Sequence, residues 1–220
     1  MLALFARVAI LRNDDVMRPS SSRPSMSERA FDDEMLIRRA QGGDRSAFDM
    51  LVSRHEIRAY QYAFRLTRNS EEAADVVAEA FIRVYNAIAT FKGQSSFATW
   101  LYRILTNCFL DFRKKIKPVS SLDVASQIGE GDLERQIEDP GPTPHDESER
   151  LEREERVERA VNRLPEYQRA MIVMYHVDML TYEEIAVALD LPIGTVKSRL
   201  NRARLTLRDY LIKDQELFRT

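Results

Sequence analysis

The chain has 220 residues and a formal net charge of -2, so it can hold one or two small domains that each bury a core. Cys108 is the only cysteine, which excludes an intrachain disulfide and favours a reducing, cytoplasmic location. The three histidines have no metal-ligand spacing, so we expect neither a metal nor another cofactor. Only seven glycines and little β-branched alternation predict an all-α protein.

The first 30 residues are expected to form a disordered extension, and we assign it no function. Residues 1–11 are apolar except for Arg7, but they lack a preceding basic segment and a following small-residue cleavage site. They are also about half as long as the roughly 20 residues that a membrane span needs, so no membrane insertion is expected. Three methionines are candidate translation starts: Met1, Met17 and Met26.

Two helices are predicted between residues 31 and 66. Asp32, Asp33 and Glu34 suit the first turn of a helix, because acidic side chains are favourable there, and Gly42-Gly43 ends it. The second helix runs from about residue 45 to 66, and its larger apolar residues are Phe48, Leu51, Val52, Tyr60 and Phe64.

A third helix begins after Asn69 and has two distinct faces. The expected core face comprises Val77, Phe81, Val84 and Ile88. The polar face comprises Asp75, Glu79, Arg83 and Asn86. From spacing alone this polar face is either ordinary surface or a docking face for another protein.

The stretch Glu72–Tyr85 (EAADVVAEAFIRVY) resembles the helix by which bacterial sigma factors bind the clamp helices of RNA polymerase, although the family usually has glutamine where this chain has Ala78. The resemblance implies that the polar face binds core RNA polymerase.

The next segment combines aromatic and basic residues in a pattern typical of single-stranded DNA binding. Gly93 and its polar neighbours break the helix, and Ser96 can cap the next one. Aromatic side chains flank this loop, and four cations lie between residues 113 and 117. Unpaired bases stack on aromatic faces while positive charge attracts the DNA backbone. The alternative is that Phe97, Trp100 and Tyr102 are core residues and that the cations only complement a helix C-terminus.

The same segment resembles the promoter-melting region of extracytoplasmic-function (ECF) sigma factors. In that family the loop corresponding to residues 90–99 forms a pocket for a base flipped from the minus-ten element, and the residue matching Asn107 helps to line it. Extruding a base costs a few kcal/mol of unstacking, which a preformed pocket can offset. The resemblance implies minus-ten DNA binding by Phe91, Lys92, Gln94, Ser95, Phe97, Trp100, Arg103, Asn107 and Arg113.

Residues 118–150 are predicted to be a flexible acidic linker. They hold nine acidic and two basic residues together with four prolines, and they show no apolar period. At about 3.3 Å per residue these 33 residues could extend roughly 110 Å, whereas two to three turns of duplex span about 70 to 100 Å. Two DNA-reading domains could therefore occupy separate promoter elements. The acidity suits a path through basic channels of polymerase or, equally, simple solubilised disorder.

The C-terminal part is predicted to contain four helices. Residues 151–164 form a charged helix, and Pro165 is expected at the first position of the next one. Five residues of that helix are expected to pack against the last two helices: Ala170, Met171, Val173, Met174 and Tyr175. Thr181 and Glu184 have the spacing of a capping box, and Pro192 ends the helix that they start.

The last helix is basic on one face and apolar on the other. The apolar face comprises Val196, Leu200, Ala203 and Leu207. The five charged residues from position 192 to 208 are all positive: Lys197, Arg199, Arg202, Arg204 and Arg208. Two short helices joined by a tight turn, the second one basic, predict a helix-turn-helix whose second helix reads DNA. The alternative is a charged face that only meets solvent.

Residues 180–186 (LTYEEIA) and 192–200 (PIGTVKSRL) resemble the C-terminal DNA-binding region of ECF sigma factors, and residues 164–169 (LPEYQR) also match. Asp190 departs from the usual glycine, but Asp tolerates the left-handed conformation that a helix end often needs. The resemblance implies minus-thirty-five DNA contacts by Thr181, Thr195, Lys197, Ser198, Asn201 and Arg202. Arg199 and Arg204 are expected to touch phosphate or to pack.

The sequence is thus identified as a member of the ECF sigma factors. The expected domains are an extension (1–30), sigma region 2 (31–117), the linker (118–150), sigma region 4 (151–213) and a tail (214–220). The resemblance implies an initiation subunit without its own catalytic site, which binds core RNA polymerase, reads the minus-thirty-five element and melts the minus-ten element of promoter DNA. An anti-sigma factor is a further expected partner, because such inhibitors are common in this class.

Two other functional classes fit the residues less well. A stand-alone helix-turn-helix regulator would normally need a dimer interface, and it would not explain the first domain. A nucleic-acid enzyme would need a carboxylate cluster for metal, or a nucleophile near the DNA, and the sequence suggests neither.

Overall fold

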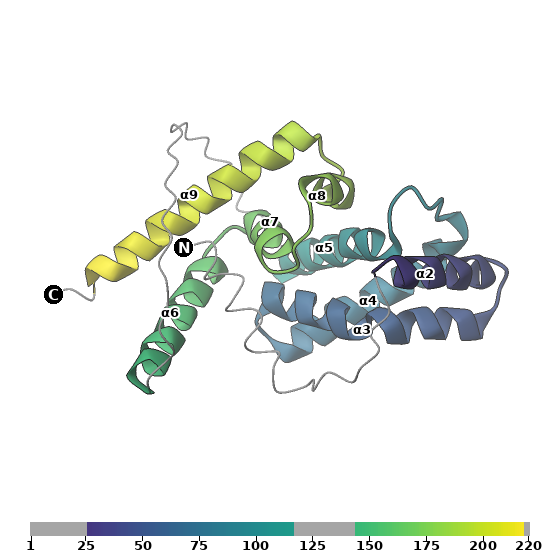
Figure 1. Cartoon of the computed structure of the whole chain (residues 1–220), viewed down its shortest axis with the longest axis horizontal. Helices are drawn as coiled ribbons and strands as arrows, with labels where there is room; N and C mark the ends of the chain where they lie inside the picture. The colour runs from purple at the N-terminus through teal and green to yellow at the C-terminus, as the bar shows by residue number, and fades with distance from the viewer. Residues whose placement is uncertain (1–25, 117–143, 218–220) are drawn as a thin grey trace.

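The computed structural model describes residues 26–116 and 144–217, and these two ranges are built from helices without any strand (Figure 1). The all-α prediction is therefore confirmed for them. Residues 1–25 and 117–143, on which most of the predicted extension and linker fall, lie outside the described part of the chain. The described elements are α2 (Met26–Gln41), α3 (Arg45–Thr67), α4 (Ser70–Ala87), the 3-10 turn η1 (Ile88–Thr90), α5 (Phe97–Ile116), α6 (Pro144–Asn162), α7 (Glu166–His176), α8 (Tyr182–Leu189) and α9 (Ile193–Leu217).

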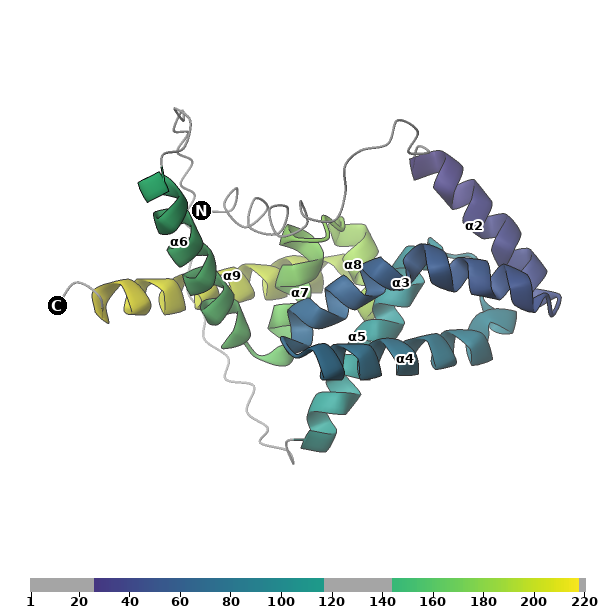
Figure 2. The same cartoon turned by 90° about the horizontal axis from the view of Figure 1, so that it is seen from below.

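The N-terminal unit packs α2, α4 and α5 around the long helix α3 (Figure 2). Leu51, Tyr62 and Leu66 of α3 are fully buried, as are Leu105 and Phe109 of α5, and all five belong to the hydrophobic core. The hydroxyl of Tyr62 lies 2.8 Å from that of Thr106, which donates in turn to the carbonyl of Tyr102 at 2.7 Å. These bonds satisfy polar groups that would otherwise be costly to bury.

The row of residues buried on helix α4 matches the predicted one only in part: Val84 and, just after the helix, Ile88 are buried as predicted. Its buried positions are Ala73, Val76, Ala80 and Val84, whereas Val77 and Phe81 are only partly buried. Alanines at two of these positions let the α4 backbone approach its neighbours closely. The larger side chains of Val77 and Phe81 then flank the contact.

Helix α2 begins at Met26, so Asp32, Asp33 and Glu34 do not form its first turn as predicted. Asp33 instead faces α3, where its carboxylate lies 2.8 Å from Nε2 of His55 and 2.7 Å from a guanidinium nitrogen of Arg54. Burial raises the pKa of Asp33, but these partners together hold it below its ordinary value. The carboxylate therefore joins α2 to α3.

Local signals in the sequence set most helix boundaries. The side chain of Asn69 accepts from the amides of Glu71 and Glu72, and the hydroxyl of Ser96 accepts from the amide of Thr99. Gly43, with φ of 89°, follows the end of α2 in a conformation that glycine adopts without strain. The predicted start of a helix after Asn69 and the predicted cap at Ser96 are confirmed.

The C-terminal unit consists of α6 to α9, with α7 lying at its centre against α8 and α9. Ala170, Met171, Val173 and Met174 are buried, as the sequence predicted. Pro165 is the N-cap of α7 and not its first helical residue, because its ψ of 143° is extended. Helix α6 starts at Pro144, inside the predicted linker, since proline is well tolerated in the first turn of a helix.

Candidate nucleic-acid interfaces

The turn between α8 and α9 has the geometry that the sequence predicted. The Thr181 hydroxyl accepts from the Glu184 amide at 3.2 Å, while the Glu184 carboxylate accepts from the Thr181 amide at 2.9 Å. At the other end of α8, Asp190 takes the left-handed conformation with φ of 55° and ψ of 51°. Val196, Leu200, Ala203 and Leu207 are all buried. The helix-turn-helix expectation is thus confirmed at both ends of α8 and along the apolar face of α9.

The polar face of α9 points away from this core. Lys197, Ser198, Asn201 and Arg202 are exposed, and Thr195 is half-buried in the first turn of the helix. Thr181 is exposed as well, although its hydroxyl already serves the capping box. Arginine, lysine and asparagine at these positions present the donors and acceptors that base edges in a major groove require.

An aromatic cluster supports the start of α9. The rings of Tyr175 and Tyr182 stack at 4.9 Å between centroids, and Lys197 lies 5.7 Å above the ring of Tyr182. Arg204 lies over Tyr175, and its Nε donates to Nε2 of His176 at 3.1 Å. Burial, with a smaller effect of Arg204, lowers the pKa of His176 to about 4, so its ring is neutral and can accept this bond.

The two arginines expected to touch phosphate or to pack both rest on tyrosines. Arg204 lies 4.8 Å from the ring centroid of Tyr175, and Arg199 lies 5.3 Å from that of Tyr167. Packing is therefore the role that the geometry supports for both of them.

The loop before α5 combines an exposed tip with an aromatic base. Lys92 and Gln94 are exposed, and Gly93 has φ of 68°. Phe91 packs on Trp100 with 4.6 Å between ring centroids, and both rings remain partly exposed. Phe97 is only 3% exposed, so its ring supports the loop from inside the core and is not available for a base to stack on.

One face of α5 continues this surface. Trp100, Arg103 and Asn107 follow each other at three- and four-residue spacing and therefore share a side of the helix. Asn107 is exposed. Arg103 pairs with Asp190 of the helix-turn-helix at 3.3 Å, and Arg113 lies 3.6 Å from Glu166 and 3.9 Å from Glu72.

Helix α4 presents a mixed acidic and apolar surface. Asp75, Glu79 and Asn86 are exposed, and Arg83 pairs with Glu79 at 2.8 Å and with Asp111 at 3.0 Å. These hydrogen bonds raise the pKa of Arg83. Ile82 and Tyr85 are each 57% exposed on the same helix. Side chains of this size at the surface, surrounded by charge, are typical of a protein contact.

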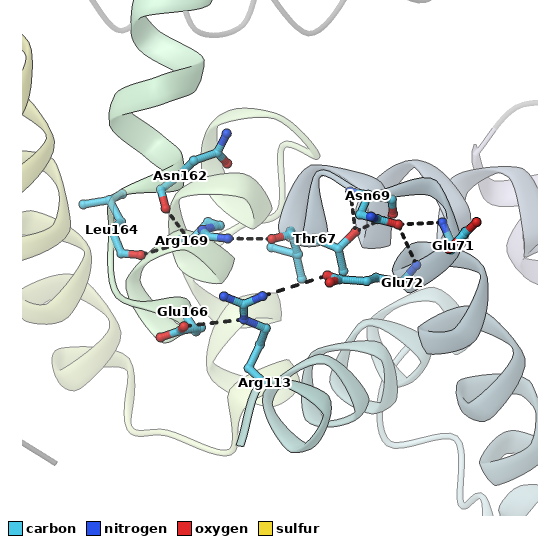
Figure 3. A network of polar contacts seen from close by, with 10 residues as sticks. Thr67, Asn69, Glu71, Glu72, Arg113, Asn162, Leu164, Glu166 and Arg169 are labelled. Carbon is cyan, nitrogen blue, oxygen red and sulfur yellow. Dashed lines mark hydrogen bonds and ion pairs between the residues drawn. The ribbon is translucent and has the colours of Figure 1, made fainter. Parts of the chain in front are cut away.

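The two helical units touch each other directly. Helix α7 packs against α3 and α5, and α8 packs against α5. Figure 3 shows Arg169 of α7 pointing at the C-terminal end of α3, with Arg113 between Glu72 and Glu166. No pattern in the sequence indicates this contact, because its residues lie on both sides of the predicted linker.

Comparison with known families gives two matches, in the order of the two helical units. Residues 51–118 match the family model of sigma-70 region 2, and residues 154–207 match that of sigma-70, region 4. The chain is 38% identical over 176 residues to the ECF RNA polymerase sigma factor SigW of Bacillus subtilis (strain 168), which covers 80% of this chain and 94% of that protein.

The chain belongs to the ECF RNA polymerase sigma factors. It is also 39% identical over 186 residues to the ECF RNA polymerase sigma-E factor of Escherichia coli (strain K12), covering 81% of this chain and 93% of that relative. Among solved structures, CnrH in complex with the cytosolic domain of CnrY has 26% identity and a TM-score of 0.58, over 83% of this chain and 99% of CnrH. The expected family is thereby confirmed, and this sigma factor directs promoter-specific transcription initiation.

Sequence reasoning missed two kinds of residue in this sigma factor. Ile82 and Tyr85 lie within the quoted α4 motif, and apolar residues beside the polar positions were a usable signal of a protein-binding surface. The arginines that join the two regions carried no such signal, because their partners are more than 50 residues away. Within the described residues no helix is long and apolar enough to cross a membrane, and no group of His, Cys, Asp or Glu is placed to hold a metal ion.

Proposed function

We propose that the exposed face of α9 reads the minus-thirty-five element as duplex DNA. The proposed contacts are Thr195, Lys197, Ser198, Asn201 and Arg202, with Thr181 at the start of α8. Exposure of these side chains opposite a fully buried row supports the assignment, because a helix can enter a major groove only with one face free.

The minus-ten element is proposed to bind at the loop 91–96 and along α5. Lys92, Gln94 and Ser95 form the tip, and Phe91 and Trp100 offer partly exposed rings for an unpaired base. Asn107 presents an amide on the same face of α5 as Trp100 and Arg103, while Arg113 lies further along the helix and adds positive charge for the backbone. Phe97 acts by holding the loop from within the core.

Core RNA polymerase is proposed to bind the outer face of α4. Asp75, Glu79, Arg83 and Asn86 supply the polar contacts, and Ile82 and Tyr85 supply apolar area at the centre of that surface. Burial of aromatic and aliphatic side chains surrounded by a polar rim is the usual anatomy of a protein interface.

As an initiation subunit, the chain is proposed to have no catalytic site of its own and to act in the cytoplasm, where RNA polymerase works. An inhibitory protein is a further proposed partner. The similar protein CnrH forms a complex with the cytosolic domain of another protein, CnrY, which supports a protein partner in addition to polymerase.

The observation that carries this assignment is that the basic face of α9 and the acidic-apolar face of α4 are both exposed and belong to different helical units. The test is transcription reconstituted from core polymerase and the purified chain on a genomic library, with start sites mapped. We expect start sites that share two upstream elements and disappear when the chain is omitted. Core polymerase that selects no new start sites would contradict the proposal.

A further inference from the structure

We propose that Gln41 is a positioning residue for the minus-ten site: its amide fixes the backbone at the start of the loop 91–96, and so sets where the ring of Phe91 is offered to an unpaired base. Gln41 is the last residue of α2 and is not one of the proposed DNA contacts. The inference rests on the proposed binding of the minus-ten element at this loop and deepens it.

The side-chain amide of Gln41 bonds two backbone carbonyls that are far from it in the sequence. Its Nε2 donates to the carbonyl of Ile88 at 3.0 Å and to that of Phe91 at 2.8 Å. Both partners are carbonyl oxygens, which only accept, so the amide nitrogen and not the amide oxygen must face them. Ile88 begins η1 and Phe91 follows it. One side chain of α2 therefore joins both ends of this turn to α2.

The other hydrogen bonds of η1 close the turn but do not attach its end to a helix. The amide of Phe91 donates to the carbonyl of Ile88 at 3.1 Å, and the hydroxyl of Thr90 donates to the carbonyl of Ala87 at 2.8 Å. Both of these bonds lie within the segment 87–91. The side chain of Ile88 is buried and anchors the start of the turn in the core, whereas the backbone at its end is anchored to α2 through Gln41.

Helix α2 is firmly attached to the core at the end that carries Gln41. Leu36 and Ile37, one turn earlier, are buried. The guanidinium of Arg39 donates to the carboxylate of Asp44 at 2.9 and 2.7 Å, and Asp44 is the N-cap of α3. Charge-assisted bonds of this kind are stronger than neutral ones. The position of Gln41 is thus set by α3 and by the core, and its two bonds pass that position on to the loop.

Phe91 connects this backbone contact to the proposed base-binding surface. Its ring packs on Trp100 with 4.6 Å between centroids, and both rings are partly exposed. The far end of the loop is fixed separately, because the hydroxyl of Ser96 accepts from an amide in the first turn of α5 at 3.1 Å. Residues 92–95 lie between these two anchors. Loss of the Gln41 bonds would release the first anchor only, and the ring of Phe91 would then move relative to Trp100.

A loop that is already in place binds an extruded base better than one that must be ordered. Extrusion costs free energy of unstacking, and ordering the loop at the same moment would add to that cost. Gln41 acts through Phe91 and need not touch the base. Its loss should therefore reduce discrimination of the base and leave the general attraction between cations and the DNA backbone unchanged.

The test uses the full chain and its own fluorescence, because Trp100 is the only tryptophan. Two variants remove the donor: Gln41→Glu replaces it with an acceptor of the same shape, and Gln41→Met with a side chain of similar length that cannot donate. Arg38→Gln is the matched control. It makes the same charge change as Gln41→Glu one turn earlier on α2, at an exposed position where Arg38 pairs with Glu34 of its own helix. Circular dichroism of each variant checks that the helices persist.

In the free chain, both Gln41 variants should shift the emission of Trp100 to longer wavelength and increase its quenching by acrylamide, because Phe91 no longer covers the indole in one fixed position. Arg38→Gln should change neither quantity.

The second measurement is made on the complex with core polymerase. It compares binding of a single-stranded minus-ten strand, taken from a mapped promoter, with binding of the same strand carrying an abasic site at each position in turn. The preference of the unmodified complex for the intact base should fall by about two- to tenfold in both Gln41 variants, which is the usual effect of losing one hydrogen bond. The preference should be unchanged in Arg38→Gln.

Unchanged fluorescence of Trp100 in both Gln41 variants would overturn the positioning role, and so would altered fluorescence with the base preference of the unmodified complex fully retained. An effect confined to Gln41→Glu, or shared by Arg38→Gln, would also overturn it, because added negative charge and not the lost donor would then be the cause. If the unmodified complex prefers no intact base at any position while both Gln41 variants still expose Trp100, the role of Gln41 in holding the loop is supported and the proposed minus-ten site is contradicted.

Discussion

The exposed side chains of α9 differ in how freely they can reach a base edge. Lys197 lies over the ring of Tyr182, and the hydroxyl of Ser198 donates to the carbonyl of Thr195 within the helix. Asn201 and Arg202 are one turn further along and fully on the exposed face. We therefore expect these two side chains to carry most of the base discrimination, with Lys197 held in place by the aromatic cluster.

Arg202→Ala should lower affinity for one promoter position and not for DNA in general. If Arg202 reads a base, its loss should cost about 1 to 3 kcal/mol at that position and relax the preference there. Binding to a library of minus-thirty-five variants measures this effect. Arg208→Ala, on a more distant exposed turn, serves as control. A uniform loss across all sequences would assign Arg202 to a phosphate contact.

Asn107→Ala should impair promoter opening more than duplex binding. The amide of Asn107 is exposed on the side of α5 that also presents Trp100, where an extruded base would lie. Reactivity of unpaired thymines on a supercoiled promoter reports opening, and a filter assay reports binding. Lys114→Ala, which removes an exposed cation near the end of α5, is the control. Normal opening in Asn107→Ala would remove this residue from the pocket.

At the scale of single helices, α8 depends on its cap more than any longer helix does. It has eight residues, and helices this short are marginal unless their ends are satisfied. Its N-terminus uses both halves of a capping box, and its C-terminus uses the left-handed Asp190. The orientation of α9 therefore depends on a few residues at either end of α8.

Thr181→Ala should destabilise region 4 by about 0.5 to 2 kcal/mol, because it removes the acceptor for the Glu184 amide. Urea unfolding followed by circular dichroism measures the change. Thr181 is also a proposed DNA contact, so Glu184→Ala is the companion variant: it removes the other half of the box from outside the DNA-binding set. Unchanged stability in both variants would show that the box contributes nothing in solution.

Asp75→Arg should abolish transcription by weakening polymerase binding, since it reverses the charge at one edge of the proposed α4 surface. Affinity for core polymerase is the measurement. Glu56→Arg, an equivalent reversal at an exposed position of α3, is the control. Binding of DNA by region 4 should be unaffected, and unchanged polymerase affinity would exclude Asp75 from the interface.

The elements themselves were largely predictable, because their signals are local. Asn69, Ser96 and Thr181 each bond to amides within three residues, so the sequence alone indicates where α4, α5 and α8 begin. The predicted start of α2 was wrong, because Asp33 does not lie in the first turn of the helix but binds His55 and Arg54 of another helix. The prediction of the buried row of α4 was partly wrong for the same reason. Helical periodicity identifies an apolar face, but the packing of neighbouring helices decides which residues of that face are covered.

At the scale of the whole molecule, Asp178 makes the stability of the fold sensitive to pH. Burial, opposed by Arg65 and Arg58, raises the pKa of Asp178 from 3.8 to about 6, and the groups that face it belong to region 2. In the unfolded chain this pKa should return to its ordinary value. The folded state therefore binds more protons than the unfolded state between about pH 4 and 6, so the contribution of Asp178 to stability increases as the pH falls through that window.

Asp178→Asn should therefore stabilise the fold at neutral pH and reduce the pH dependence of unfolding between pH 4 and 6. A pKa difference of two units corresponds to at most about a hundredfold change in the folding equilibrium constant. Urea unfolding followed by circular dichroism at several pH values from 4 to 7 tests the expectation. A pH dependence that is unchanged in the Asp178→Asn variant would assign it to another group.

The sequence by itself determined the helices, the helix-turn-helix, the exposed basic face of α9 and the family, because caps, turn residues and apolar periods act over a few neighbouring residues. Tertiary structure alone decided how helices from distant parts of the chain cover one another. It buried Phe97, placed Ile82 and Tyr85 at the surface and brought arginines of region 2 onto carboxylates of region 4. Those contacts join residues more than 50 positions apart. Their partners are therefore set by how whole helices pack, which no local pattern encodes.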